Sequence, residues 1–331
     1  MDKLTTEVKL EIKKRPTQTL LRDSTVETEK VYDKIVRIKQ PRRDFIKVPE
    51  KFDGRVEWKG LLSPVMNQGT CGSCWAFASS STLADKFNIQ SIGLLNVELS
   101  AAHMILCYFD EDSFESEASS NVQETTKNQS ESIKTNACFG NSLYEAFRYL
   151  YLLGTCTDAC IPYNNNLGPN NQYKKLGTFG KTSEIPLCSA VTGKFGDMCS
   201  DYTLDALTGE ELGTPIRFYR ALHFYYVSGT SIYGGDEYNI RHNIYGWGPV
   251  CTAMRIYPDF YTFNPKTTIY EWNGEGPQIG GHAIEIVGWG KEKNQKYWII
   301  KNSWGVEWGL NGYFKMIRGN NNCKIEENVL T

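Results

Sequence analysis

The stretch Asn67-Gln68-Gly69-Thr70-Cys71-Gly72-Ser73-Cys74-Trp75-Ala76-Phe77 decides the fold, because it reads as a cysteine at the start of a buried helix. A glycine-containing turn leads into Cys74, and small and apolar residues follow it. At a helix N-terminus the aligned peptide dipoles favour a thiolate, which is the form of cysteine that attacks carbonyl groups. The stretch therefore predicts a helix that begins near Cys74 and carries a nucleophile.

A cysteine nucleophile requires an imidazole that takes its proton, and the imidazole requires a partner that fixes its orientation. Two downstream segments supply candidates. Gly280-Gly281-His282-Ala283-Ile284 places a histidine at the start of an apolar strand. Lys301-Asn302-Ser303-Trp304-Gly305 follows, with Asn302 placed 20 residues after His282. Together the segments predict nucleophilic catalysis by Cys74 and His282.

In sequence and in order, these segments resemble those of papain-like cysteine proteases, and the resemblance runs from about Val48 to the C-terminus. It implies an α+β fold with a helical left domain, a β-barrel-like right domain and the active-site cleft between them. It also implies that Cys74 is the nucleophile, His282 the general base and acid, and Asn302 the residue that orients the histidine. Gln68 matches the side-chain donor of the oxyanion hole, where one lost donor costs on the order of 3 kcal/mol of barrier.

Within this family the chain is most similar to the cathepsin B branch, through the segment Asn243–Val250 and through Arg318-Gly319 followed by Cys323. Cys74 and His282 are 208 residues apart, which exceeds the roughly 130 to 150 typical of papain and cathepsins, so insertions must lie between them.

The resemblance also implies substrate-binding positions, some of which depart from the family's pattern. The family's Cys-Asn-Gly-Gly turn is here Cys138-Phe139-Gly140-Asn141, so we expect altered binding on the unprimed side by Gly140 and Asn141. Gly281 and Trp304 are expected to lie beside the histidine. Asn328 aligns with the cathepsin B acid that accepts arginine at P2, so a preference for basic P2 residues is not implied.

Residues 1–47 form a charged leader with 13 Lys and Arg against 8 Asp and Glu, whereas the remainder has 23 against 30. The leader has too few apolar residues to build a core of its own. We therefore expect it to fold onto the catalytic domain, residues 48–331, as an inhibitory pro-segment. A disordered tail is the alternative.

The catalytic domain divides into a helical left half, about 48–160, and a strand-rich right half, about 210–331. The right half alternates apolar runs with Gly, Asn and Pro turns, which indicates strands. The predicted elements are strands at Val250–Tyr257, Ala283–Trp289, Tyr297–Lys301 and Gly312–Ile317, and a short helix at Tyr238–Tyr245.

Two insertions are expected, at about 110–136 and about 163–208. The first is rich in Glu, Ser, Thr and Asn, which is typical of a solvated loop. The second lies where cathepsin B-like enzymes carry an occluding loop with two adjacent histidines that bind a substrate C-terminal carboxylate. Residues 163–208 contain no histidine.

Ten cysteines are more than a cytosolic enzyme usually keeps, so we expect disulfides and an oxidising setting that is lysosome-like, extracellular or within a particle. No apolar stretch near Met1 is typical of a signal peptide, so the localisation stays unassigned. The resemblance pairs Cys71 with Cys138. Among the remaining disulfide candidates, we expect Cys107 and Cys160 to pair with Cys188 and Cys199.

The composition limits the kinds of partner that we expect the chain to bind. The chain has 331 residues, 40% of them hydrophobic, and a formal net charge of −2, which agrees with a globular enzyme and gives no charge excess for nucleic acid. No apolar run is long enough to span a membrane. Cys71 and Cys74 form a lone Cys-x-x-Cys, but no second such pair and no His-x-x-x-His pair occurs that would complete a zinc site. We expect a monomer without metal or cofactor.

The sequence thus predicts a cysteine-type endopeptidase, made as a zymogen, whose partners are peptide or protein substrates and its own leader. Three alternatives stay open. A cathepsin B-like C-terminal exopeptidase would release dipeptides, and a transamidase would give ligated products. A binding or structural protein on the same fold would give no products.

Overall fold

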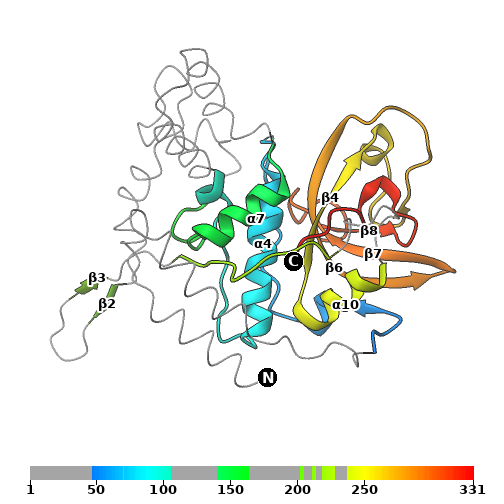
Figure 1. Cartoon of the computed structure of the whole chain (residues 1–331). Helices are drawn as coiled ribbons and strands as arrows, with labels where there is room; N and C mark the ends of the chain where they lie inside the picture. The colour runs from blue at the N-terminus through cyan, green and yellow to red at the C-terminus, as the bar shows by residue number, and fades with distance from the viewer. Residues whose placement is uncertain are drawn as a thin grey trace, which may run out of the picture.

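The computed structural model describes residues 47–69, 71–105, 140–163, 202–204, 211–213, 218–227 and 237–331. The predicted leader up to residue 46 and the predicted insertion 110–136 lie outside these residues. Of the predicted insertion 163–208, the structure describes Tyr163 and strand β2 (Tyr202–Leu204), which pairs antiparallel with β3 (Glu211–Gly213). The other described segments form helices on one side and a six-stranded sheet on the other (Figure 1).

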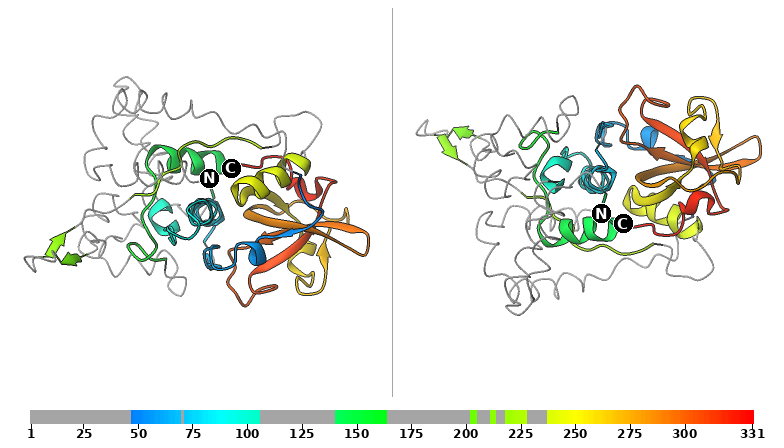
Figure 2. Two further views of the ribbon diagram at one scale, coloured as in Figure 1. Left: turned by 90° about the horizontal axis from the view of Figure 1, so that it is seen from below. Right: turned by 90° about the horizontal axis from the view of Figure 1, so that it is seen from above.

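Helix α4 (Cys74–Gln90) lies at the centre, between α7 and the sheet (Figures 1 and 2). Alanine, serine and threonine make up much of its buried surface, so neighbours approach it closely from both sides. The buried hydroxyls of Ser79 and Ser80 donate to main-chain carbonyls one turn earlier, those of Trp75 and Phe77, at 2.7 and 3.3 Å. The predicted helix start at Cys74 is confirmed.

Helix α7 (Leu143–Leu152) covers one side of α4. Ser142 caps its N-terminus, where the serine side-chain oxygen accepts a hydrogen bond from the Glu145 main-chain N–H at 3.1 Å. Its apolar face, which includes Phe147 and Leu150, packs into the core that surrounds α4. After α4, Asn88 exchanges two hydrogen bonds with the main chain of Val97 and so fixes the returning segment.

Strand β6 (Gly280–Glu292) is the central strand of the sheet. Its first half pairs antiparallel with β4 (Val250–Ile256), and residues further along pair with β1 (Phe52–Asp53). On its other edge the order continues with β7 (Gln295–Lys301), β8 (Tyr313–Ile317) and β5 (Ile269–Tyr270), the last parallel to β8. The four strands predicted in the right half are confirmed, although β6 extends beyond the predicted Ala283–Trp289.

A second core fills the sheet half, with Trp289, Trp298 and Phe314 fully buried. Helix α10 (Glu237–Trp247) packs Ile240 and Ile244 into it, so the predicted helix here is confirmed. Short elements complete the half: α3 (Gly54–Glu57) and the 3₁₀ helices η2 (Pro258–Tyr261) and η3 (Asn322–Lys324). No helix in the described part of the chain is long and apolar enough to cross a membrane.

Two segments pack against the half of the molecule to which their place in the sequence does not assign them. Phe52 belongs to the core of the sheet half, although it precedes α4 in the chain. Ala221 packs in the helical core, and Tyr219 pairs with Thr155 there. The chain therefore ties its two halves together with exchanged segments rather than with a single linker.

We predict that Gly288→Ala destabilises the fold. A Cβ atom at Gly288 would overlap the Phe52 carbonyl oxygen of β1, which is main chain and cannot rotate away. Such overpacking costs about 1–3 kcal/mol in the free energy of unfolding. Urea unfolding measures it, and Gly280→Ala on the same strand is the control because its Cβ meets nothing within 4 Å. Equal stability of the two variants would contradict the close packing of β1 on β6.

Candidate active site

Cys74 is the first residue of α4, and its thiol faces strand β6 of the sheet half. The first turn of the helix carries no acidic side chain, so nothing there opposes a negative charge on the sulfur. Main-chain N–H groups of Trp75 and of Ala283 on β6 donate hydrogen bonds to the sulfur. Elements from both halves therefore surround the thiol.

His282 lies near the start of β6 and forms a side-chain hydrogen bond with Cys74. Its other contact is with Asn302, whose Oδ1 lies 2.7 Å from the Nε2 atom of the ring. An amide oxygen only accepts, so Nε2 carries the proton and Nδ1 is left for the thiol. The Ser303 main-chain N–H also donates to this Oδ1 at 2.9 Å, which fixes the amide.

The surroundings of Cys74 favour its thiolate form. Burial raises the pKa of the Cys74 thiol, but the hydrogen bond and charge of His282 and the two main-chain donors outweigh it. The pKa therefore lies below its ordinary value. By contrast, burial raises the pKa of the Cys156 thiol to about 12 and that of Cys251 well above its usual range. Among these described free thiols, Cys74 is the one suited to nucleophilic attack.

Gln68 is held beside this pair by contacts at both ends of its side chain. Its Nε2 donates to the Cys71 carbonyl at 2.8 Å, and its Oε1 accepts from the Ser303 hydroxyl at 2.6 Å. Its main-chain N–H donates to the Ser303 carbonyl, and Tyr163 donates to its carbonyl at 2.8 Å. The second N–H of the amide and the Cys74 main-chain N–H are the donors suited to an oxyanion.

Trp304 lies over the His282 ring, with the ring centroids 5.0 Å apart. The exposed Tyr261 stacks on Trp304 in turn, with the two rings 5.9 Å apart and nearly parallel. This aromatic pair covers the histidine from the solvent side, so the hydrogen bond between His282 and Asn302 is largely excluded from water.

Other predicted positions lie in several places. Gly281 directly precedes His282 on β6 and is exposed. Gly140 and Asn141 lie in the segment before α7, and within the described residues they contribute no hydrogen bond to Cys74 or His282. Asn328 is exposed after η3, and the neighbouring Glu327 is paired with Lys324 at 2.7 Å. The described contacts thus bring Cys74, His282, Asn302, Gln68 and Trp304 together.

Cys71, Cys160 and His103 have surroundings that differ from those of Cys74 and His282. Cys71 and Cys160 are disulfide-bonded, while Cys107, Cys138, Cys188 and Cys199 lie outside the described residues, so the predicted pairing stays a prediction. His103 is buried, contacts Thr155, and has its pKa lowered to about 4 by burial. Across the described ranges, no group of three or more His, Cys, Asp or Glu is placed to hold a metal ion.

Sequence reasoning missed three contributors to this site. The Ser303 hydroxyl stood within a segment already singled out, so its position beside Asn302 was an available signal. Ala283 likewise stood in a segment already singled out, directly after His282, whereas the Tyr163 hydroxyl carried no such signal, because its role depends on a contact across the fold.

Comparison with known proteins agrees with this geometry. The profile of papain family cysteine proteases matches residues 48–331. Cathepsin B-like cysteine proteinase 4 of Caenorhabditis elegans is 32% identical over 299 residues, which cover 86% of this chain and 74% of that protein. For cathepsin B-like CP3 of Giardia intestinalis the identity is 30% over 283 residues, covering 85% and 73%.

Among solved structures, procathepsin B S9 of Trypanosoma congolense superimposes with a TM-score of 0.61 at 23% identity, covering 88% of this chain and 80% of that one. Bromelain of Ananas comosus superimposes with a TM-score of 0.55 at 21% identity, covering 86% and 98%. The predicted α+β papain-like fold is confirmed, and so is the likeness to the cathepsin B branch.

We predict that iodoacetamide alkylates Cys74 at pH 6, where an unperturbed thiol is less than about 1% thiolate. His282→Ala should slow this reaction at least about tenfold, because it removes the partner that stabilises the thiolate. Mass mapping of the alkylated residue over a pH series measures both effects, and the buried Cys156 and Cys251 are internal controls. An unchanged rate in His282→Ala would contradict the pairing.

Proposed function

The chain belongs to the papain family of cysteine proteases, and from that premise we propose that this cysteine peptidase is an endopeptidase made as a zymogen. The hydrogen-bonded series Cys74–His282–Asn302 is the observation that carries the proposal. Each position that acyl transfer requires is filled: a nucleophile, a base, an orienting residue and a donor for the oxyanion.

We assign the steps as follows. The Cys74 thiolate attacks the peptide carbonyl carbon, and the carbonyl electrons move to the oxygen, where Gln68 and the Cys74 N–H stabilise the charge. The C–N bond then breaks as the His282 imidazolium gives its proton to the leaving amine. His282 then takes a proton from a water molecule, which attacks the thioester carbonyl. The C–S bond breaks, which releases the carboxylic acid product and restores the Cys74 thiolate. Asn302 holds the ring in one orientation throughout.

The sequence of the second insertion favours endopeptidase over exopeptidase activity. An enzyme that binds the C-terminal carboxylate of its substrate needs a cation or paired donors on the primed side of the cleft. Residues 163–208 contain no histidine that could serve as the cathepsin B pair does. Peptides that extend in both directions from the scissile bond are therefore the proposed substrates, and the proposed active form is a monomer.

Charge supports an inhibitory role for the leader. Residues 1–47 carry a net charge of +5 and the remainder −7, so the two attract each other. Procathepsin B S9 is a proenzyme by its name, which fits a zymogen. In this proposal the leader lies across or beside the cleft and is removed or displaced for activity.

We predict that an internally quenched peptide with an amidated C-terminus and its free-acid counterpart are cleaved at similar rates, because residues 163–208 lack the histidine pair that would select the terminal carboxylate. Mass analysis of the products over time identifies the bonds that break. Cys74→Ser is the control and should abolish both rates, because a serine hydroxyl is a far weaker nucleophile than a thiolate. Stepwise release of dipeptides from the free acid alone would establish the exopeptidase instead.

We further predict that a chain beginning at Val48 is labelled faster at Cys74 by a small thiol-directed epoxide than the full chain, because the leader no longer shields the cleft. The two rates should converge as the pH falls below about 4, where carboxylates that attract the basic leader become protonated. Labelling rates from mass spectrometry across pH provide the measurement. Equal rates at every pH would mean that the leader does not restrain the enzyme.

A further inference from the structure

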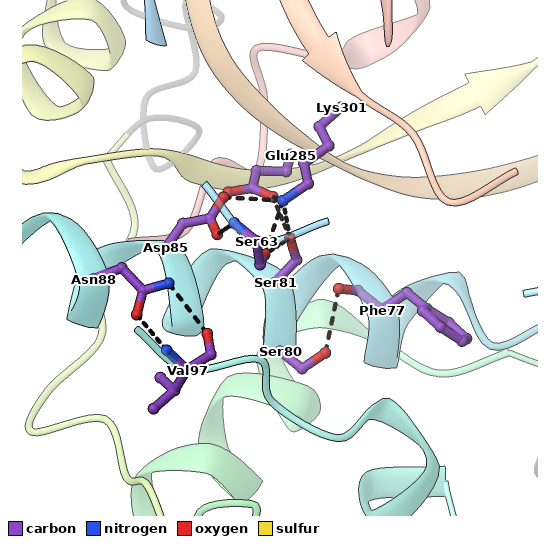
Figure 3. A network of polar contacts seen from close by, with 9 residues as sticks. All are labelled: Ser63, Phe77, Ser80, Ser81, Asp85, Asn88, Val97, Glu285 and Lys301. Carbon is purple, nitrogen blue, oxygen red and sulfur yellow. Dashed lines mark hydrogen bonds and ion pairs between the residues drawn. The ribbon is translucent and has the colours of Figure 1, made fainter. Parts of the chain in front are cut away.

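A cluster of buried polar side chains joins α4 to the sheet (Figure 3). The Lys301 ammonium of β7 uses all three of its N–H groups, donating to Ser63 Oγ at 2.9 Å, Ser81 Oγ at 2.8 Å and Asp85 Oδ2 at 3.0 Å. Ser81 donates in turn to Glu285 Oε2 of β6 at 2.6 Å, and the Ser63 main-chain N–H donates to Asp85 Oδ1 at 2.5 Å.

The charges in this cluster do not balance if both acids are ionised. The side chains of Lys301, Asp85 and Glu285 are at most 3% exposed, so water does not solvate them. One ammonium faces two carboxyl groups, and Lys301 lies 3.6 Å from Glu285 as well as 3.0 Å from Asp85. Leaving a second carboxylate charged in such a place is costly, because burial penalises an uncompensated charge.

Geometry identifies which acid holds a proton. Glu285 Oε1 is buried and accepts no hydrogen bond in the described part of the structure, whereas both oxygens of Asp85 have donors. Asp85 is also close enough to Glu285 to raise the pKa of the Glu285 carboxyl. An ionised carboxylate only accepts hydrogen bonds, so Glu285 can donate to Asp85 only if it carries a proton. The proton therefore belongs on Glu285.

The cluster is linked by short stretches of backbone to each residue of the active site. Glu285 is three residues after His282 on β6, and Lys301 directly precedes Asn302 on β7. Asp85 lies on α4, whose first residue is Cys74. A change in the spacing between α4 and β6 at the cluster is thus a change in the alignment of the thiol with the imidazole.

We propose that Glu285 is a positioning residue for Cys74 and His282, and that it acts in its protonated form by bridging β6 to Asp85 of α4. The proposal rests on the peptidase function proposed above. When Glu285 loses its proton, two carboxylates face one ammonium, the bridge becomes a repulsion, and the catalytic pair loses its alignment.

Other titratable groups lie around Glu285. On α4 the half-buried Lys86 interacts with the charge of Glu285 and donates to the Trp247 carbonyl at 3.3 Å. Burial lowers the pKa of the Lys86 ammonium to about 7, so Lys86 adds a second positive charge mainly below that pH. Burial raises the pKa of the Cys251 thiol on β4 and raises that of Tyr313 on β8 to about 12, so both stay neutral through the physiological range.

The direction of the pKa shift of Glu285 agrees with a proton on this side chain. Burial and the nearby Asp85 raise the pKa of Glu285 from 4.5 to about 8. The folded chain keeps this proton up to about pH 8, whereas the unfolded chain releases it near pH 4.5. Between these values the folded state binds more protons, so stability falls as the pH rises, and the folding equilibrium constant changes up to about tenfold per pH unit.

Glu285→Gln tests the proton without any assay of activity, because glutamine keeps the shape but cannot ionise. The ratio of folding equilibrium constants, variant over natural chain, should rise about tenfold per pH unit between about pH 5 and 8 and then level off. Denaturant unfolding of the full chain measures this ratio, in which other titrating groups such as His103 cancel. A ratio independent of pH would overturn the proposal.

Two further variants sharpen the result. Glu292→Gln is the matched control on the same strand, because Glu292 is exposed and pairs with Lys315 at 2.8 Å, and its ratio should stay flat above pH 5. Asp85→Asn leaves Glu285 as the sole carboxyl group facing Lys301, so the fall in stability should move to lower pH. If Glu285→Gln folds poorly, the shift in Asp85→Asn decides the question.

Measurements of peptidase activity distinguish a positioning role of Glu285 from an effect on stability alone. The ratio of kcat values, Glu285→Gln over natural chain, should rise about tenfold between pH 7 and 9. The reason is that about a tenth of Glu285 stays protonated at one pH unit above a pKa near 8. The ratio of KM values should stay constant over the same range. A pH-dependent stability with a flat kcat ratio would overturn the positioning role. Hydrolysis by neither chain would count against the proposed function, whereas the unfolding data would still decide where the proton lies.

Discussion

The fold depends on the close packing of α4 between two dissimilar neighbours. One side of this helix lies in an apolar core with α7, and the other faces β6 and β4 of the sheet. Small side chains permit both contacts, and buried hydroxyls such as that of Ser79 return their hydrogen bonds to the helix itself. Because the helix begins at Cys74, the packing that joins the halves also sets where the thiol lies.

Local patterns in the sequence predicted what depends on local structure. The helix start at Cys74 and the four strands of the right half follow from apolar periodicity and from Gly, Asn and Pro turns, and the structure has them. Strand β1 could not be predicted in this way. Its two residues, Phe52 and Asp53, are too few to show an alternation of apolar and polar residues, and they form a strand only by pairing with β6. The extension of β6 past Trp289 likewise depends on its pairing with β7.

Long-range contacts explain what the sequence left unpredicted in the site. His282 and Asn302 were recognisable because each lies in a short segment of distinctive composition. The bond from Ser303 to Gln68 joins residues 235 positions apart, and that from Lys301 to Asp85 spans 216. No pattern within one segment signals such a pair. The contacts that could not be predicted from the sequence are therefore concentrated at the boundary between the helices and the sheet, where distant segments of the chain pack together.

The boundary and the cores on either side of it depend on contacts that respond differently to heat. Apolar packing, such as that of Trp289 and Phe314, gains little strength per unit area as the temperature rises. The hydration of charged groups becomes less favourable on warming, so the cost of keeping Lys301 and Asp85 dry diminishes. The joint between α4 and the sheet thus becomes relatively stronger than the cores on either side of it, and a warmed molecule keeps its two halves in register until those cores themselves loosen.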